Sequence, residues 1–178
     1  MKPHLLIASP VLQDPLFART VVLVWHYDEQ GATGIVVNRP IKTPLSKALN
    51  LPVDLDMSYY ETTWVSWGGP VEGSMGTAVT RGLIDPSEGI VLGPDVSMTH
   101  NEQTLIRLLT ERQDLRLCVG YAGWGPGQLD AELAAGGWLY TDINAQLIFD
   151  EPSATCYEQA LATLGLTIGS VGSAAIEA

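Results

Sequence analysis

A glycine-rich turn between an apolar strand pattern and a short helical pattern is the most conspicuous candidate for chemistry in this sequence. It lies within residues 118–133 and carries Gly123, Gly125 and Gly127. Such a turn can cradle a phosphate, because free backbone N–H groups and the positive end of the helix dipole attract anions. The pattern therefore raises the possibility of a phosphate-binding loop.

Three features of the same turn argue against a phosphate. Pro126 removes one backbone N–H group. Asp130 and Glu132 already place negative charge in the first helical turn, where each contributes roughly 0.3–1 kcal/mol. No lysine or arginine follows Arg116, and the spacing differs from the GxxxxGK[ST] loop. These features favour a tight turn with Trp124 packed beneath it.

The other reactive side chains form no motif that specifies a metal or a nucleophile. His4, His26 and His100 lack metal-ligand spacing, so we expect no metal, and we expect no cofactor. No G-x-S-x-G sequence marks a hydrolase elbow. His26 and Asp28 could orient a general base only if they share one face of a strand, and a structural role is favoured.

Arg39 and the two cysteines leave alternatives open. Arg39 follows a buried strand pattern, so its charge suits either a salt bridge to a nearby aspartate or a contact with an anionic ligand. Two cysteines are typical of reduced thiols in a cytoplasmic protein. We expect Cys118 to be buried and Cys156 to be more accessible. A thiol switch between them remains a weaker alternative.

Composition limits the protein class. With 178 residues, of which 46% are hydrophobic, the chain has the size of one domain, spanning 1–178. A net charge of −11 opposes direct contact with nucleic acid. The apolar runs are too short to span a membrane, and the N-terminus lacks a signal-peptide core. We therefore expect a cytoplasmic protein.

The elements that must position these residues alternate irregularly. Strand patterns cover 5–8, 20–26, 32–38, 62–67, 76–80, 89–92 and 115–122, with 20–38 as a hairpin. Helical patterns cover 43–49, the segment behind a capping box at Thr99 and Glu102, 128–135 and 157–164, whereas 138–143 and 145–149 suit either state. Strands come in clusters, which indicates an α+β fold with antiparallel pairing. The tail from about residue 167 has little to anchor it.

Four motifs in this order resemble the AlgH/YqgE family of bacterial proteins. They are Leu6–Pro10 with Asp14, Pro15 and Phe17; Gly31–Pro40; Gly68–Val71; and Gly120–Leu129 with Glu132 and Trp138. The resemblance implies a bifurcated, largely antiparallel sheet with a small closed-barrel portion, surrounded by helices. It implies no established reaction. A link to exopolysaccharide regulation in some bacteria has given the family a transcriptional-regulator label.

Four turns, rather than the regular elements, carry the unusual residues, and loops commonly carry function. These conspicuous turns are Ser9–Phe17, Asn38–Pro40, Gly68–Val71 and Gly123–Gln128. We therefore expect a non-enzymatic module that binds an unidentified protein or small molecule through these turns. The alternative is a hydrolase or transferase with a carboxylate- or Cys156-based site there. The candidate binding residues are Asp14, Phe17, Asn38, Arg39, Gly69, Trp124 and Gln128.

Overall fold

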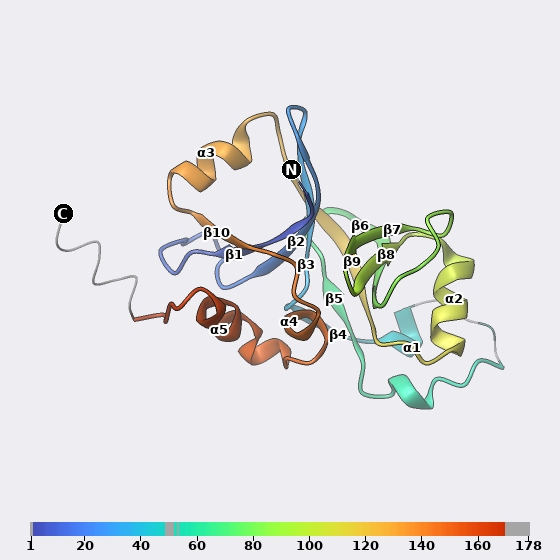
Figure 1. Cartoon of the computed structure of the whole chain (residues 1–178). Helices are drawn as coiled ribbons and strands as arrows, with labels where there is room; N and C mark the ends of the chain where they lie inside the picture. The colour runs from blue at the N-terminus through green and yellow to red at the C-terminus, as the bar shows by residue number, and fades with distance from the viewer. Residues whose placement is uncertain (1, 49–51, 53, 170–178) are drawn as a thin grey trace.

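The computed structural model describes residues 2–48, 52 and 54–169 (Figure 1). The strands are β1 (His4–Ala8), β2 (Val21–Asp28), β3 (Gly31–Val36), β4 (Pro40–Pro44), β5 (Trp64–Trp67), β6 (Val71–Arg81), β7 (Ile90–Gly93), β8 (Val96–Thr99), β9 (Leu115–Trp124) and β10 (Trp138–Thr141). The helices are α1 (Leu45–Ala48), the 3-10 turn η1 (Ser58–Tyr60), α2 (Glu102–Thr110), α3 (Gln128–Ala134), α4 (Ala145–Phe149) and α5 (Ser153–Thr163).

The strands form one strongly curled, mostly antiparallel sheet in the order β10-β1-β2-β3-β9-β6-β8-β7, with β4 and β5 off this path. The curl makes a half-barrel, and the helices lie around it (Figure 1). The expected α+β class and the antiparallel hairpin of β2 and β3 are confirmed. Most of the tail that begins at about residue 167 lies outside the described residues.

Strand β9 is where the sheet branches. It pairs antiparallel with β6 along one edge and with β3 near its end, and it pairs parallel with β5 through Cys118 and Val119. Gly68 links the branches, because its N–H donates to Val119 O at 2.7 Å while its carbonyl accepts from Val36 N at 2.8 Å. The bifurcation implied by the family resemblance is thus built around β9.

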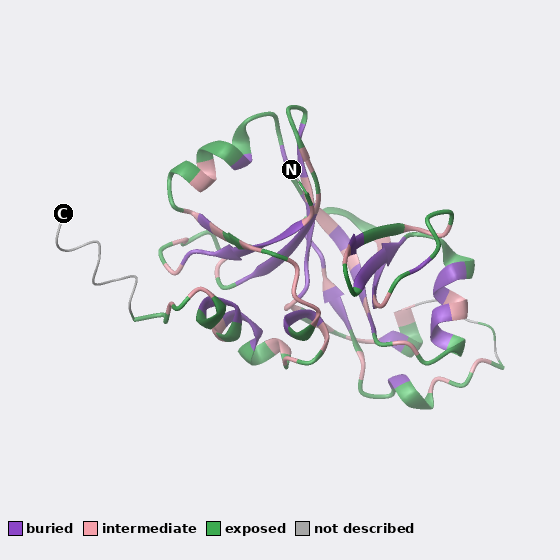
Figure 2. Ribbon diagram, in the orientation of Figure 1, coloured by how far each residue is buried: buried purple, intermediate pink, exposed green. Residues whose placement is uncertain are grey.

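Two hydrophobic clusters fill the two sides of this branched sheet. The larger contains β1, β2 and β3 with the buried residues of α4 and α5. The smaller contains the apolar stripe of α2, namely Leu105, Leu108 and Leu109, packed with residues of β5, β6 and β9. Figure 2 shows buried residues on the inward faces of these helices and along the central strands. Burial of amphipathic faces, rather than propensity, therefore fixes the helices.

Two local predictions differ from the structure, and one that was left open is decided. Residues 40–44 form strand β4, because Pro40 and Pro44 lie opposite Ser66 and Trp64 of β5, and only 45–48 are helical. Residue 49 lies outside the described part. Residues 96–99 form a strand that the sequence patterns did not predict. The ambiguous segments 138–143 and 145–149 contain strand β10 and helix α4.

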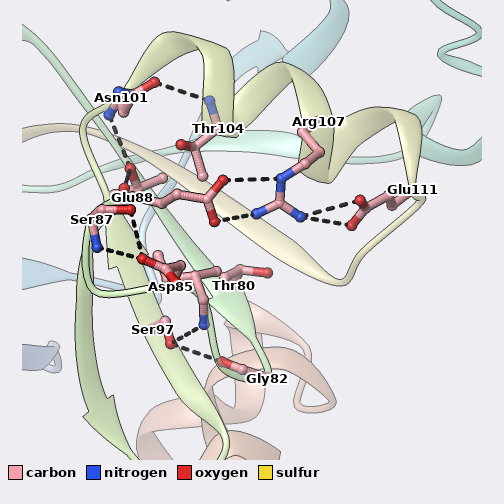
Figure 3. A network of polar contacts seen from close by, with 12 residues as sticks. Thr80, Gly82, Asp85, Ser87, Glu88, Ser97, Asn101, Thr104, Arg107 and Glu111 are labelled. Carbon is pink, nitrogen blue, oxygen red and sulfur yellow. Dashed lines mark hydrogen bonds and ion pairs between the residues drawn. The ribbon is translucent and has the colours of Figure 1, made fainter.

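The capping box predicted at Thr99 is also wrong. Asn101 caps α2, and its Oδ1 accepts from Thr104 N at 3.0 Å. Thr99 instead ends β8, accepts from Asn101 N at 3.0 Å, and donates to Glu88 O at 2.6 Å. Figure 3 shows this network, in which Arg107 of α2 also reaches the Glu88 carboxylate at 2.7 Å. Pairing of β8 thus moves the helix start two residues downstream.

Replacing Gly69 by alanine is expected to destabilise the fold. Gly69 has φ +155°, and an added Cβ would lie 2.2 Å from Tyr121 O on β9. Clash and backbone strain should lower the free energy of unfolding by more than about 1 kcal/mol. Gly73→Ala is the matched control, because no atom lies within 4 Å of its Cβ position. Urea denaturation measures both variants, and equal midpoints would contradict the branch geometry.

Candidate functional site

Phe17 packs against three tryptophans from distant parts of the chain. Its ring centroid lies 6.1 Å from that of Trp67, 6.3 Å from that of Trp124 and 5.8 Å from that of Trp138. Asp14 fixes the turn that presents Phe17, because its Oδ1 accepts from Leu16 N at 2.8 Å and from Phe17 N at 3.3 Å. The turn before β2 is therefore tied to β5, β9 and β10.

Glu132 on α3 holds two of these tryptophans by their indole N–H groups. Its Oε2 accepts from Trp124 Nε1 at 2.9 Å and from Trp138 Nε1 at 2.7 Å. Its Oε1 accepts from Gln128 Nε2 at 2.8 Å, while Gln128 Oε1 accepts from Gly125 N at 3.1 Å. A buried indole N–H needs a hydrogen-bond acceptor, so one carboxylate satisfies both rings and closes the glycine-rich turn.

Arg39 and Asn38 attach the chain after β3 to the turn that carries Phe17. Arg39 donates to the carbonyls of Leu16 and Ala18, and its guanidinium carbon lies 5.4 Å from the centre of the Trp67 ring. Asn38 accepts from Val21 N at 2.8 Å and donates to Arg19 O at 3.0 Å. Of the two alternatives left open for Arg39, the salt bridge to an aspartate is not formed among the described residues, because its partners are carbonyls and a ring.

These contacts bring the conspicuous turns together. We call Phe17, Arg39, Trp67, Trp124, Glu132 and Trp138 the motif cluster. Gly69 belongs to it through backbone only, since it is buried against Tyr121 of β9. Asp14 and Gln128 remain exposed at its edge. Sequence reasoning missed the role of Glu132 as common acceptor, although Gln128 and Glu132 are four residues apart on α3, which places their side chains near each other.

The cavities found among the described residues lie elsewhere. The first, about 660 Å³, is a groove lined by residues before and within β5 and by the α4–α5 connection. The second, about 320 Å³, lies between the β7–β8 turn and the segment after β10. No residue of the motif cluster lines any of the described cavities. The motif cluster is therefore packed without a cavity among those described, and a ligand would have to bind on its outer surface.

Neither cysteine is placed for nucleophilic chemistry. Both cysteines are free and buried. The predicted burial of Cys118 is confirmed, whereas the prediction of a more accessible Cys156 is wrong. Burial raises the pKa of Cys118 to about 12 and that of Cys156 to about 11. The Cys156 thiol also donates to Leu147 O at 3.3 Å. Because the thiolate is the nucleophile, burial and a raised pKa both disfavour reaction of either thiol at neutral pH.

The histidines are separate from one another and have different partners. His26 Nε2 lies 3.2 Å from Asp28 Oδ2, and both side chains are about half exposed. His100 contacts Thr77 Oγ1 at 3.1 Å. His4 is buried, and its Nδ1 is hydrogen-bonded to the Lys2 carbonyl oxygen at 3.0 Å. Within the described residues, no group of three or more His, Cys, Asp or Glu side chains is arranged to hold a metal ion.

Known proteins resemble this chain over almost its whole length. The AlgH-like family model matches residues 5–169. The chain belongs to the AlgH-like family. A UPF0301 protein of Sodalis glossinidius is 32% identical, with 98% of this chain and 97% of that protein covered. A relative from Photobacterium profundum is 36% identical, with 92% and 91% covered.

Two solved structures share the fold of this AlgH-like protein. The solution structure of AlgH from Pseudomonas aeruginosa superposes with a TM-score of 0.76 at 30% identity, covering 96% of this chain and 92% of the other. A protein of Corynebacterium diphtheriae gives the same TM-score at 18% identity, covering 91% and 86%. Among the described residues of the AlgH-like chain, no helix has both the length and the apolarity to cross a bilayer.

Glu132→Gln is expected to weaken the motif cluster. The amide supplies one acceptor oxygen where the carboxylate supplies two, so its NH₂ group would face either the two indole N–H groups or the donating amide of Gln128. We expect a loss of about 1–3 kcal/mol in the free energy of unfolding and a change in tryptophan fluorescence. Glu29→Gln, in the exposed β2–β3 turn, is the control. Unfolding midpoints that match for both variants would count against the role of Glu132.

Stability should fall at mildly acidic pH because of His4. Burial lowers the pKa of His4 from the usual 6.5. Just below pH 6.5, His4 is therefore protonated in the unfolded chain more than in the folded chain. Stability is therefore lost as the pH falls through about 6.5. Thermal melting from pH 7.5 to 5.5 should show a flatter pH dependence for His4→Gln than for the wild type. Identical slopes would argue against the effect.

Proposed function

We propose that this AlgH-like protein is a cytoplasmic, non-enzymatic regulatory module that binds a partner, most readily a protein, through the surface over its motif cluster. The single observation that carries the proposal is the cluster itself. Phe17, Arg39 and Glu132 tie together turns that are far apart in the sequence. A rigid, preorganised surface loses little conformational freedom on binding, so such ties favour affinity.

The outer surface beside the cluster has the composition of a contact site. Leu16, next to Phe17, is 48% exposed, and Val11 in the same segment is 54% exposed. Gly125–Gln128 are exposed on the neighbouring turn, where backbone groups of the glycines are open to a partner. Exposed apolar side chains close to accessible backbone suit a protein surface better than a small molecule, which would require a cavity.

The charges of the chain argue against direct nucleic-acid binding. Arginines contact the protein's own carboxylates, carbonyls or rings: Arg19 with Glu158, Arg39 with Trp67, Arg81 with Asp150, Arg107 with Glu88, Arg112 with Asp56, and Arg116 with Glu151 O. Phosphate contacts need free cations. Any influence on transcription, as the family resemblance implies, would therefore pass through the bound partner.

The enzymatic alternative has less support. It required a nucleophile or acid in a concave site at the turns. Residues of the motif cluster line none of the described cavities, and burial raises the pKa of Cys156. Glu132, the carboxylate within the cluster, accepts three N–H groups and is occupied with holding the turns.

A Val11→Asp/Leu16→Asp double variant tests the proposal. Both side chains are exposed, so the fold should tolerate the change, whereas two charges would oppose an apolar contact. In affinity capture from lysate of the native host with quantitative mass spectrometry, we expect at least a tenfold loss of the specific partner. Leu83→Asp is the control, because Leu83 is 65% exposed and follows β6, away from the motif turns in sequence.

The control decides the outcome. A partner retained by wild type and Leu83→Asp but lost by the double variant supports the assigned surface. A partner captured equally by all three proteins, or none recovered above background by the wild type, would contradict it. Circular dichroism and thermal melting of each variant verify that the fold is intact before capture.

A further inference from the structure

The groove beside the start of β5 is a cavity that no residue of the motif cluster lines. Its volume is about 660 Å³, within the usual range for ligand sites. Its lining includes Trp64, the first residue of β5, Thr62 before that strand and Tyr59 of η1. The connection between α4 and α5, which includes Asp150 and Glu151, lines the same groove. The groove therefore lies where the two halves of the branched sheet and their helices meet.

Aromatic rings are unusually open in this groove. Trp64 is 48% exposed although its neighbour Val65 is buried in the core. Tyr59 is also about half exposed and packs edge-on against Tyr60, with ring centroids 5.0 Å apart. An exposed tryptophan beside a cavity leaves a free π-face, and a tryptophan face is the best aromatic partner for a cation.

The charged groups of the groove leave one carboxylate without a cation. Arg81, behind the groove wall, pairs with Asp114 at 3.3 Å and with Asp150, and its guanidinium lies 5.2 Å from the Phe149 ring centre. Arg116 donates to the carbonyls of Ile148 and Glu151, at the end of α4. The Glu151 side chain, although half-buried, pairs with no lysine, arginine or histidine among the described residues.

We propose that this groove binds a small organic cation, with a guanidinium or ammonium group held between the Trp64 ring and the Glu151 carboxylate. A half-buried carboxylate favours a cationic partner, because it is less well solvated than one in open water. The adjacent contact between Arg81 and Phe149 shows that this part of the fold already pairs a guanidinium with both a ring and carboxylates. The protein's net charge of −11 draws cations toward it.

The cation has two sources with the same chemistry, a free amine or an arginine side chain of a polypeptide. Agmatine represents the first, and N-acetyl-arginine N-methylamide represents the second. The citrulline analogue of the second probe has nearly the same shape without the charge. Isothermal titration of the full chain with these probes should show saturable 1:1 binding of a charged probe, with Kd on the order of 10 µM to 1 mM.

Two variants locate the site. Glu151→Gln should weaken binding about tenfold by removing the charge, and Trp64→Ala roughly three- to thirtyfold by removing the ring. Glu61→Gln, an exposed acid near the groove but outside its lining, and Tyr140→Ala, an exposed ring on β10, are the controls. Melting curves of all four variants show whether the fold is retained.

Each result decides for or against the site. Tighter binding of agmatine assigns a free amine, and tighter binding of the blocked arginine assigns a protein side chain. Absence of saturable binding for both charged probes would overturn the proposal. Wild-type affinity in both Trp64→Ala and Glu151→Gln, or binding of the citrulline analogue as tight as that of the charged probe, would also overturn it. The Val11→Asp/Leu16→Asp variant should retain cation binding, because neither residue lines the groove.

Discussion

The branched sheet depends on direct contact between backbones at β9. An added Cβ at Gly68 would lie 2.2 Å from Gly120 O, and one at Gly120, which has φ +73°, would lie 2.5 Å from Gly69 O. Any side chain at these positions would therefore separate the segment after β5 from β9. Because Gly68 also bonds to Val36, that separation would move β3 as well. The glycines permit one strand to serve both halves of the molecule.

The motif cluster follows from this close approach. Bringing β5 against β9 places Trp67 and Trp124 next to Phe17, and β10 adds Trp138. Indole N–H groups in such packing require acceptors, and Glu132 on α3 supplies them. The packing of Phe17 and the hydrogen bonds of Glu132 together hold the conspicuous turns in one arrangement. Their conformation is a consequence of the branch, and the proposed binding surface is the outer face of that arrangement.

The sequence predicted what local patterns control. The hairpin of β2 and β3, the strand β9 and the glycine-ended helix α3 follow from alternation and turn residues. The helix starts predicted at Pro44 and Thr99 are wrong, because pairing of β4 with β5 and of β8 with β6 overrides these local signals. Arg39 shows the limit for the site: its charge indicated an ionic partner, and only the tertiary structure reveals carbonyls and a ring.

The central claim, that the conspicuous turns form one cooperative unit, is tested most directly by a double-mutant cycle. Phe17→Leu and Glu132→Gln act on residues that do not bond to each other but share Trp124 and Trp138. From urea unfolding of the wild type, both single variants and the double variant, we predict an interaction energy of about 0.5–3 kcal/mol. Additive effects, within about 0.3 kcal/mol, would contradict a single unit.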